Sequence, residues 1–361
     1  MGDRALKILS VIGNRPQFVK AAPLSRALRR HADEVLVNSG QHYDPELADL
    51  FFDELDIPVP EHALDVGAGN PNEQLALIIQ RLDPLIGAEQ PDLVMVYGDT
   101  TTTLGGALAA AKRNVPIAHV EAGLRSFVRS MPEEQNRVVT DHLSELLFVP
   151  TEVAVANLAR EGITDGVKVV GDVMYDAALL FAPVAKTRPG AAAYGLTPGE
   201  YVLVTIHRAA ATDTPEALRA MVGCLSAIGE PAVFPVHPRT RHKLEQAGLW
   251  EAVNMIPDLH IAPPVGYLDF TALLVTARAV VTDSGGVQKE AYFHAVPCIT
   301  VREETEWVET VQGGFNTLTG LNPSAVAAAL TDTTVPAVRP DYYGDGDAAG
   351  KIVREILARL A

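Results

Sequence analysis

The feature that most constrains the fold of this chain is a regular alternation of two kinds of segment. Short apolar runs alternate with longer segments whose apolar residues have helical spacing. In the first half, the apolar runs predict strands at 6–12, 34–38, 93–97, 117–120, 146–149 and 168–170. The segments between them predict helices at 16–30, 72–89, 101–113, 133–145 and 152–161. Strands that alternate with helices form parallel sheets with helices on both faces. The first half therefore predicts a doubly wound α/β sheet.

The same alternation restarts after a stretch rich in proline, glycine and alanine at 182–200, which predicts a linker. Further strands are predicted at 201–206, 232–236, 259–262, 279–282 and 298–301, and helices at 215–229, 268–276, 287–294 and 348–360. A chain of 361 residues is too long for one ordinary core. We therefore predict two Rossmann-like doubly wound parallel-sheet domains that face a cleft, formed by 1–170 plus 350–361 and by 171–349.

The composition excludes several classes of protein. The formal net charge is −16 and there is no extended cluster of Lys and Arg, so no nucleic-acid partner is expected. Cys224 and Cys298 each lie among apolar residues, which predicts buried small side chains rather than a metal site or a disulfide. The chain has no signal-peptide pattern and no apolar run long enough to span a bilayer, so we expect a cytoplasmic protein without a membrane partner.

In parallel sheets, ligands bind at the carboxyl ends of the strands. Three carboxylates are predicted at such ends in the first half: Asp99, Glu121 and Glu133. Taken alone, Asp99 is better explained as the N-cap of the next helix, and Glu133 as a carboxylate that the dipole of its helix stabilises. If all three converge at one edge, their negative charges repel one another and raise the pKa of at least one carboxyl group. A general acid or base needs such an environment.

Cations accompany these acids. The loop after the first predicted strand places Arg15 at the strand end and Lys20 one helical turn later. It is not a GxGxxG loop, so a dinucleotide fingerprint is absent there. Two cations at a helix N-terminus suit a phosphate group, and surface charges remain the alternative.

The second half carries the strongest single motif. A predicted strand ends at Thr282, Asp283 and a turn of Ser284, Gly285 and Gly286 follow, and a helix then carries Glu290. Glycines let the backbone approach a diphosphate, whose charge a helix N-terminus favours. His207 and His237 also follow strands, where binding and a structural hydrogen bond are both open. No spacing of His, Cys or carboxylate residues fits a metal site.

Together these motifs resemble the non-hydrolysing UDP-N-acetylglucosamine 2-epimerases, a family with the glycosyltransferase B-type fold. The matching stretches follow the family's order and are 13–16, 39–42, 97–100, 119–125, 131–134, 205–208 and 282–290. Within this family, the stretches 15–18, 287–290 and 305–309 resemble one branch more than the others. That branch includes epimerases of UDP-2,3-diacetamido-2,3-dideoxy-glucuronic acid beside archaeal-type UDP-N-acetylglucosamine enzymes.

The resemblance implies a UDP-sugar substrate, no cofactor, and a homodimer. It implies that UDP elimination across C1–C2 and re-addition invert C2, with a closed cleft retaining UDP. The residues implied to contact substrate are Ser284, Gly285 and Gly286 at the diphosphate, Glu290 at the ribose, Phe270 by the uracil, and Arg15 and His237 near phosphate. The implied acid, base and leaving-group residues are Asp99, Glu121, Glu133 and His207, with Lys20 in support.

Two stretches depart from the family pattern. Members usually carry Glu-Asn shortly after the histidine-arginine pair, where this chain has Ala210 and Ala211. The loop 41–44 lacks part of the pattern with which some members bind an activating second substrate, so no such activation is expected. Three other functions stay open: a hydrolysing epimerase that releases N-acetylmannosamine and UDP, a glycosyltransferase, and a UDP-sugar-binding protein without activity.

Overall fold

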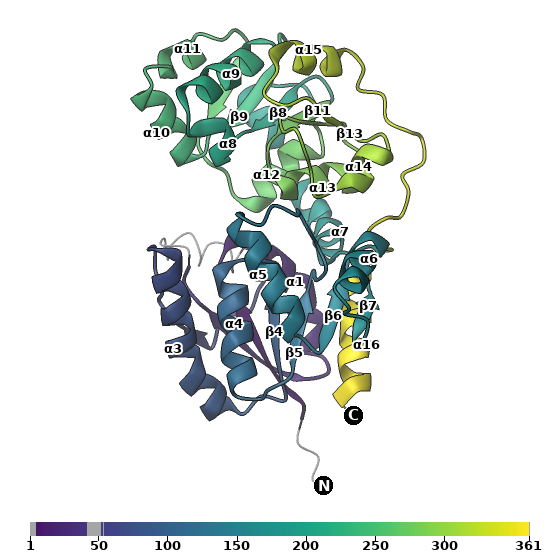
Figure 1. Ribbon diagram of the computed structural model, residues 1–361. Coiled ribbons are helices and arrows are strands. Elements are labelled where there is room, and N and C mark those ends of the chain that lie inside the picture. Colours follow the sequence, from purple (N-terminus) through teal and green to yellow (C-terminus); the bar gives the residue numbers. More distant parts are fainter. Residues whose placement is uncertain (1–4, 42–51, 53, 361) are drawn as a thin grey trace. The chain divides into compact units, whose positions relative to one another are not determined.

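The computed structural model describes residues 5–41, 52 and 54–360, which form two compact units (Figure 1). The first unit comprises the chain as far as Leu179 and the segment from Asp341 onward, and the second comprises Leu180–Pro340. The junctions expected from the sequence lie after residue 170 and before residue 350. The first unit extends further because the backbone N–H of Asp172 donates to the carbonyl oxygen of Tyr343 at 3.0 Å. This bond joins its two segments.

In the described part of the first unit, seven parallel strands form one sheet in the order β3-β2-β1-β4-β5-β6-β7. The strands are β1 Lys7–Ile12, β2 Asp33–Asn38, β3 His62–Ala63, β4 Leu93–Tyr97, β5 Ile117–Val120, β6 Leu146–Val149 and β7 Val167–Val169. The helices are α1 Arg15–Leu28, α3 Pro71–Glu89, α4 Thr101–Lys112, α5 Pro132–Leu143, α6 Glu152–Arg160, the start of α7 Val173–Ala185, and α16 Ala348–Leu360. Chain order reverses between β1 and β4, and such a switch point is where open α/β sheets bind ligands.

The central strands of this sheet are buried along their whole length, as in β4 and β6. Helices α3, α4 and α5 pack side by side, and α1 packs against α16 (Figure 1). A strand covered on both faces needs apolar side chains at every position rather than at alternate ones. This is why these strands read as continuous apolar runs in the sequence.

The described second unit has six parallel strands in the order β10-β9-β8-β11-β12-β13. They are β8 Val202–Thr205, β9 Ala232–Pro235, β10 Leu259–Ala262, β11 Ala279–Thr282, β12 Cys298–Thr300 and β13 Asn316–Leu318. The helices are η1 Gly190–Tyr194, α8 Ala209–Thr212, α9 Pro215–Ser226, α10 Pro238–Gln246, α11 Trp250–Asn254, α12 Tyr267–Leu274, α13 Gly285–Phe293, α14 Val308–Gln312 and α15 Pro323–Thr331, together with the end of α7. Its switch point lies between β8 and β11.

The predicted fold class of two doubly wound parallel-sheet units is confirmed, and every predicted strand is present. The short edge strands β3 and β13 escaped prediction because they hold too few apolar residues to form a run. The linker predicted at 182–200 is partly wrong. Helix α7 continues to Ala185 through Pro183, and η1 occupies Gly190–Tyr194. Apolar and alanine side chains continue the helix past a residue that usually ends one.

Asp176 makes the stability of the first unit depend on pH. Its carboxylate accepts the backbone N–H groups of Ala348 and Ala349, at 3.0 and 2.7 Å, where α16 begins. Burial raises the pKa of Asp176 to about 6, against the opposing effect of these two bonds. Between pH 4 and 6 the folded state therefore holds more protons than the unfolded state, so stability falls as pH rises through this window. The effect is at most about 3 kcal/mol.

We expect Asp176→Asn to flatten this dependence, because an amide does not titrate. Urea unfolding at pH 4.5 and pH 7 measures it. The control is Asp345→Asn, since Asp345 is exposed and pairs with Lys351 in the same segment. If the wild type and Asp176→Asn lose stability equally between the two pH values, the assignment to Asp176 is wrong.

Candidate functional site

The loops after β1 and β4 are neighbours at the switch point of the first unit, because these strands pair. Asn14 caps α1, and its side-chain oxygen accepts the N–H of Gln17 at 3.2 Å. The amide nitrogen of Gln17 in turn donates to the carbonyl oxygen of Tyr97 at 2.8 Å. The start of α1 is thereby fastened to the end of β4, and Arg15 lies exposed in this anchored first turn.

Lys20 and Glu121 form a buried ion pair in which Lys20 Nζ donates directly to Glu121 Oε2. Glu121 holds a left-handed backbone with φ of 69°, which a residue with a side chain rarely adopts. Gly98 also has a positive φ of 63°, and a Cβ there would lie 3.1 Å from Lys20 Nζ. Strain of this kind gathers at functional sites, where the surrounding structure holds it. Gly98 takes its positive φ without strain because it is a glycine, so the strained residue is Glu121. The ion pair and Gly98 lie together at the ends of β4 and β5.

Asp99 is not the N-cap of α4, so that alternative is wrong. Thr100 is the cap, in a capping box with Thr103. The Asp99 carboxylate instead accepts from Arg137 Nη2, and its side chain stays 30% exposed. Asn136 adds a hydrogen bond of 2.9 Å to the carbonyl oxygen of Asp99. Asp99 is thus held by α5 and remains accessible.

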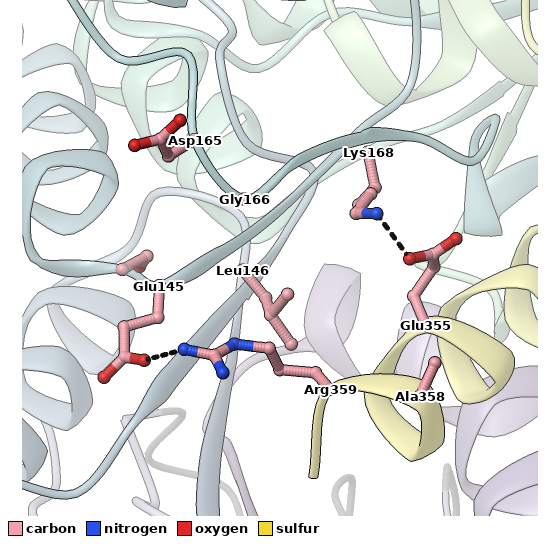
Figure 2. Close-up of a pocket in the computed structure, with 9 residues that line it drawn as sticks. Glu145, Leu146, Asp165, Gly166, Lys168, Glu355, Ala358 and Arg359 are labelled. Atoms are coloured by element: carbon pink, nitrogen blue, oxygen red, sulfur yellow. Dashed lines mark hydrogen bonds and ion pairs between the residues drawn. The ribbon is translucent and has the colours of Figure 1, made fainter. Parts of the chain in front are cut away.

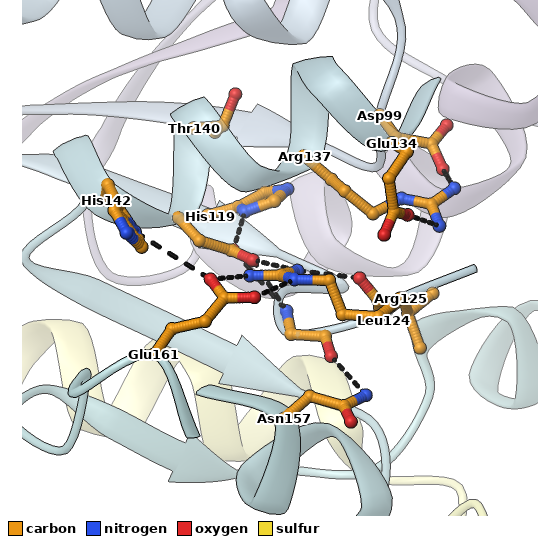
Figure 3. Close-up of polar contacts among 12 residues, drawn as sticks. Asp99, His119, Leu124, Arg125, Glu134, Arg137, Thr140, His142, Asn157 and Glu161 are labelled. Carbon is orange, nitrogen blue, oxygen red and sulfur yellow. Dashed lines mark hydrogen bonds and ion pairs between the residues drawn. The ribbon is translucent and has the colours of Figure 1, made fainter. Parts of the chain in front are cut away.

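The two glutamates at the start of α5 behave differently. Glu133, which the sequence analysis selected, is exposed in the first turn. Glu134 is buried, and its carboxylate accepts the backbone N–H groups of Ser126 and Phe127, each at 2.9 Å, and Arg137 Nη1 at 3.0 Å (Figure 3). The structure therefore brings Glu134 into contact with the partner of Asp99 and leaves Glu133 at the surface.

Sequence reasoning missed Arg137, which bridges Asp99 and Glu134. A signal for it was present, because Glu134 and Arg137 have the i, i+3 spacing of a helical ion pair. Asp99, which is accessible, and Glu121, which has a strained backbone, thus each contact a cation. Such pairs can move a proton to and from a bound molecule while the cation balances the charge.

In the second unit, the switch point between β8 and β11 is organised by Asp283. This carboxylate is 1% exposed and accepts the backbone N–H groups of His207 at 2.9 Å and Arg208 at 2.7 Å. His207 Nδ1 also lies 3.4 Å from Asp283 Oδ1. The buried acid therefore sets the conformation of the loop that follows β8.

His207 stacks on His237, with ring centroids 5.6 Å apart and planes 27° from parallel. His237 caps α10, because its Nδ1 accepts the N–H of Arg239 at 3.2 Å. Nδ1 is therefore unprotonated in this tautomer, and Nε2 carries the hydrogen. The predicted pair of histidines is brought together, and His237 itself is exposed.

The Ser-Gly-Gly turn leads into α13, as predicted. A Cβ at Gly285 would lie only 2.5 Å from Glu306 Oε1, so a larger residue here would displace the Glu306 side chain. Arg302 and Arg208 contact Glu306 at 3.0 and 3.5 Å. Burial favours the neutral form of Glu306, but these two charges outweigh it and lower its pKa. Two arginines and a helix N-terminus beside glycine backbone form a setting that suits a diphosphate.

Glu290 is buried in the second turn of α13. It lies against Tyr267 of α12, whose hydroxyl pKa stands well above its usual value through burial and then the charge of Glu290. Phe270, one turn further along α12, is half-buried against the core that includes Tyr201 and Leu203. Glu290 and Phe270 therefore belong to two helices that contact each other through Tyr267.

Two of the pockets that the described residues form lie in the first unit. One, of about 560 Å³, is at the amino ends of β6 and β7 (Figure 2), lined by the ion pairs Lys168–Glu355 and Arg359–Glu145 at 2.7 and 3.3 Å. It holds none of the predicted residues. The other, of about 650 Å³, is lined by Glu134 and the exposed Phe127 among others. Only the second adjoins the acid and base candidates.

Within residues 5–41, 52 and 54–360, no helix is both long and apolar enough to cross a membrane. In the same described residues, no three His, Cys, Asp or Glu side chains are grouped so as to hold a metal ion. His42, Tyr43 and Asp44, which belong to the loop 41–44 of the sequence analysis, lie outside the described residues.

The similarity to known proteins extends over nearly the whole chain. A family model described as UDP-N-acetylglucosamine 2-epimerase matches residues 26–357. A UDP-N-acetylglucosamine 2-epimerase homolog from Methanococcus maripaludis is 45% identical over 358 residues, covering 98% of this chain and 100% of that protein. The UDP-2,3-diacetamido-2,3-dideoxy-D-glucuronate 2-epimerase of Pseudomonas aeruginosa is 43% identical over 365 residues, covering 98% and 100% respectively.

Among solved structures, the crystal structure of Methanocaldococcus jannaschii UDP-GlcNAc 2-epimerase in complex with UDP-GlcNAc and UDP is similar to this one. The TM-score is 0.90 at 39% identity, and the match covers 98% of this chain and 100% of that chain. The similarity therefore extends to both units rather than to a shared sheet alone. With its family model, its relatives and this structure in agreement, the chain belongs to the UDP-N-acetylglucosamine 2-epimerase family.

Proposed function

We propose that this chain is an isomerase that inverts C2 of a UDP-2-acetamido sugar by eliminating UDP and adding it back. The observation that carries the proposal is the pair of carboxylates that follow β4 and β5 in the first unit, each in contact with a cation. These are Asp99 with Arg137 and Glu121 with Lys20. Relatives named as 2-epimerases of UDP sugars support it.

The chemistry explains why such a set is needed. The C2 proton of the sugar is not acidic, because no carbonyl is adjacent to C2. A carboxylate removes this proton while the C1–O bond breaks, and the electron pair of that bond leaves with UDP. The glycal that remains takes UDP back at C1 and a proton at C2 on the opposite face. Asp99, Glu121, Glu133 and His207 are proposed for proton transfer and for the departing diphosphate, with Lys20 in support.

The second unit is proposed to hold UDP. Its Ser284, Gly285 and Gly286 would receive the diphosphate at the start of α13. Arg208, which lies near Glu306, would supply a positive charge. Glu290 is proposed for the ribose and Phe270 for the uracil. Arg15 of the first unit and His237 are proposed near phosphate. No step requires a cofactor.

Two substrates fit the names of the relatives: UDP-GlcNAc, and UDP-2,3-diacetamido-2,3-dideoxy-D-glucuronate. We expect solvent deuterium to enter C2 of one of them, because the proton is exchanged during elimination and re-addition. Proton NMR in D₂O with each substrate measures this, with protein-free samples as the control. Only one of the two should exchange rapidly, since the substituents at C3 and C6 differ.

Other results would contradict the proposal in distinguishable ways. Free N-acetylmannosamine and UDP would indicate a hydrolysing epimerase. Binding of UDP without any exchange at C2 would indicate a binding protein, the alternative raised by Ala210 and Ala211. In the structure Ala210 is exposed and Ala211 is buried in the core of the second unit.

The proposal also includes a homodimer and a cytoplasmic location. Light scattering coupled to size-exclusion chromatography tests the first, and fractionation of cells tests the second. A monomer at micromolar concentration would contradict the dimer.

A further inference from the structure

A largely buried network of polar side chains adjoins Asp99 in the first unit (Figure 3). It is centred on His119 of β5, which is 0% exposed. His119 Nε2 lies 2.6 Å from the carbonyl oxygen of Gly98, and Nδ1 lies 2.7 Å from Asp141 Oδ1. Gly98 directly precedes Asp99 in the sequence. The imidazole is therefore bonded to the backbone from which Asp99 projects, and no proposed function has been assigned to it.

The hydrogen on Nε2 follows from its partner. A carbonyl oxygen only accepts, so Nε2 must donate to Gly98. Nδ1 faces Asp141, which also accepts from Gly123 N–H at 3.2 Å and from Arg125 Nη1 at 2.7 Å. Burial would raise the pKa of Asp141, but His119 and Arg125 hold it below its usual value. An ionised Asp141 fixes the plane of the imidazole and so the direction of the bond to Gly98.

Asp141 also shares helix α5 with Arg137, which bonds the Asp99 carboxylate. Asp141 and Arg137 are four residues apart in α5, so they lie on the same side of the helix. Arg137 bonds the Asp99 carboxylate, and Asp141 anchors α5 to β5 through His119. Arg125 extends the anchor to Glu161 with a bond of 2.6 Å. The Gly98 backbone is thus bonded to the buried His119–Asp141 pair, and the Asp99 side chain is bonded to Arg137, which lies on the same helix as Asp141.

We propose that His119 is a positioning residue for Asp99: its Nε2 hydrogen bond to Gly98 fixes the corner that aims this carboxylate. The catalytic part of the proposal rests on the function proposed above. His119 itself does not touch substrate, because it is fully buried. A misplacement of a reacting group by about 1 Å costs on the order of 100-fold in rate. Loss of this single bond therefore lowers kcat and leaves UDP binding by the second unit unchanged.

Two amide replacements separate the two bonds of the ring. The amide nitrogen of glutamine at position 119 reaches the position of Nε2, and that of asparagine reaches the position of Nδ1. His119→Gln therefore retains a donor for Gly98, whereas His119→Asn retains only the contact with Asp141. We expect kcat of His119→Asn to fall on the order of 100-fold with KM nearly unchanged, and His119→Gln to retain most of it.

The matched control is Glu34→Gln. Glu34 is also buried and charged in the first unit, and it bonds Ser10 at 2.7 Å and Arg29 at 2.9 Å near the start of β2. This variant should lose stability while keeping kcat. Circular dichroism reports the folded fraction of each variant, so a rate loss through unfolding is recognised.

Amide hydrogen exchange supplies a readout that does not depend on activity. Faster exchange in the peptide that covers 97–101 is expected in His119→Asn and not in His119→Gln. Equal kcat and equal exchange in the two variants would overturn the positioning role. Wild-type protein that leaves C2 unexchanged would overturn the proposed function, and the exchange pattern would then still decide whether His119 holds the Gly98–Asp99 corner.

Discussion

Glu121→Gln is expected to lower kcat by about 10²- to 10⁴-fold, because an amide cannot take or return a proton. Shape is nearly preserved, and an oxygen still faces Lys20 Nζ, so the KM for the UDP sugar should change little. Deuterium incorporation at C2 gives the rate of the proton-transfer step directly. A Glu121→Gln protein that retains the wild-type kcat would show that this carboxylate takes no part in proton transfer.

The same substitution also removes one charge of a buried pair, so stability must be separated from chemistry. Lys20 and Glu121 are both largely buried, and an unpaired buried charge costs up to about 3–5 kcal/mol. The double variant Glu121→Gln with Lys20→Met removes the remaining charge. Its Tm should lie above that of Glu121→Gln, while its kcat stays low. Recovery of both Tm and kcat in the double variant would mean that the single variant was merely unstable.

Asp283→Asn is expected to lower the Tm and to weaken UDP binding at least about tenfold. Its carboxylate accepts the backbone N–H groups of His207 and Arg208 at Oδ2, and the same His207 nitrogen lies 3.1 Å from Oδ1. Asparagine removes the negative charge and, with its oxygen in the place of Oδ2, points its amide NH₂ at the His207 N–H. A lost hydrogen bond to a charged group is worth about 1.5–3 kcal/mol. The loop after β8 would then shift His207 and Arg208 away from their present positions. Thermal unfolding and calorimetric titration with UDP measure the two effects.

Asp213→Asn is the matched control for this experiment. Asp213 is an exposed carboxylate of the same unit that contacts Arg239 at 2.6 Å and Lys243 at 3.6 Å. Exposed ion pairs of this kind contribute little to stability, so Tm and UDP affinity should remain near those of the wild type. If Asp283→Asn behaves like Asp213→Asn, then Asp283 does not hold the loop, and the site must be organised by other contacts.

Much of the fold was predictable from the sequence because its strands are buried on both faces. The runs 93–97, 117–120 and 146–149 were predicted with the bounds that β4, β5 and β6 have in the structure. Nearly continuous apolar side chains mark such strands, with His119 of β5 as the polar exception. The same logic identified the loops that hold Asp99, Glu121 and His207, because ligand-binding residues follow strands in parallel sheets.

Prediction failed where local pattern and packing disagree. Pro183 marks a linker in the sequence, yet α7 continues through it. Glu133 and Glu134 are adjacent and chemically identical, but successive residues point about 100° apart around a helix. Which of them is buried depends on the loop that packs against α5, and that loop presents its N–H groups to Glu134. No pattern within α5 contains this information.

The sequence by itself determined the alternation of strands and helices, the identity of the residues at each strand end, and the family to which these motifs belong. Only the tertiary structure decided which of these residues meet. The sheet order sets β4 between β1 and β5, and so joins Lys20 to Glu121 and Asp99 to Arg137. Such pairs lie far apart in the chain, and burial rather than local spacing selects them. A buried charge is stable only next to a partner, and the fold alone supplies that partner.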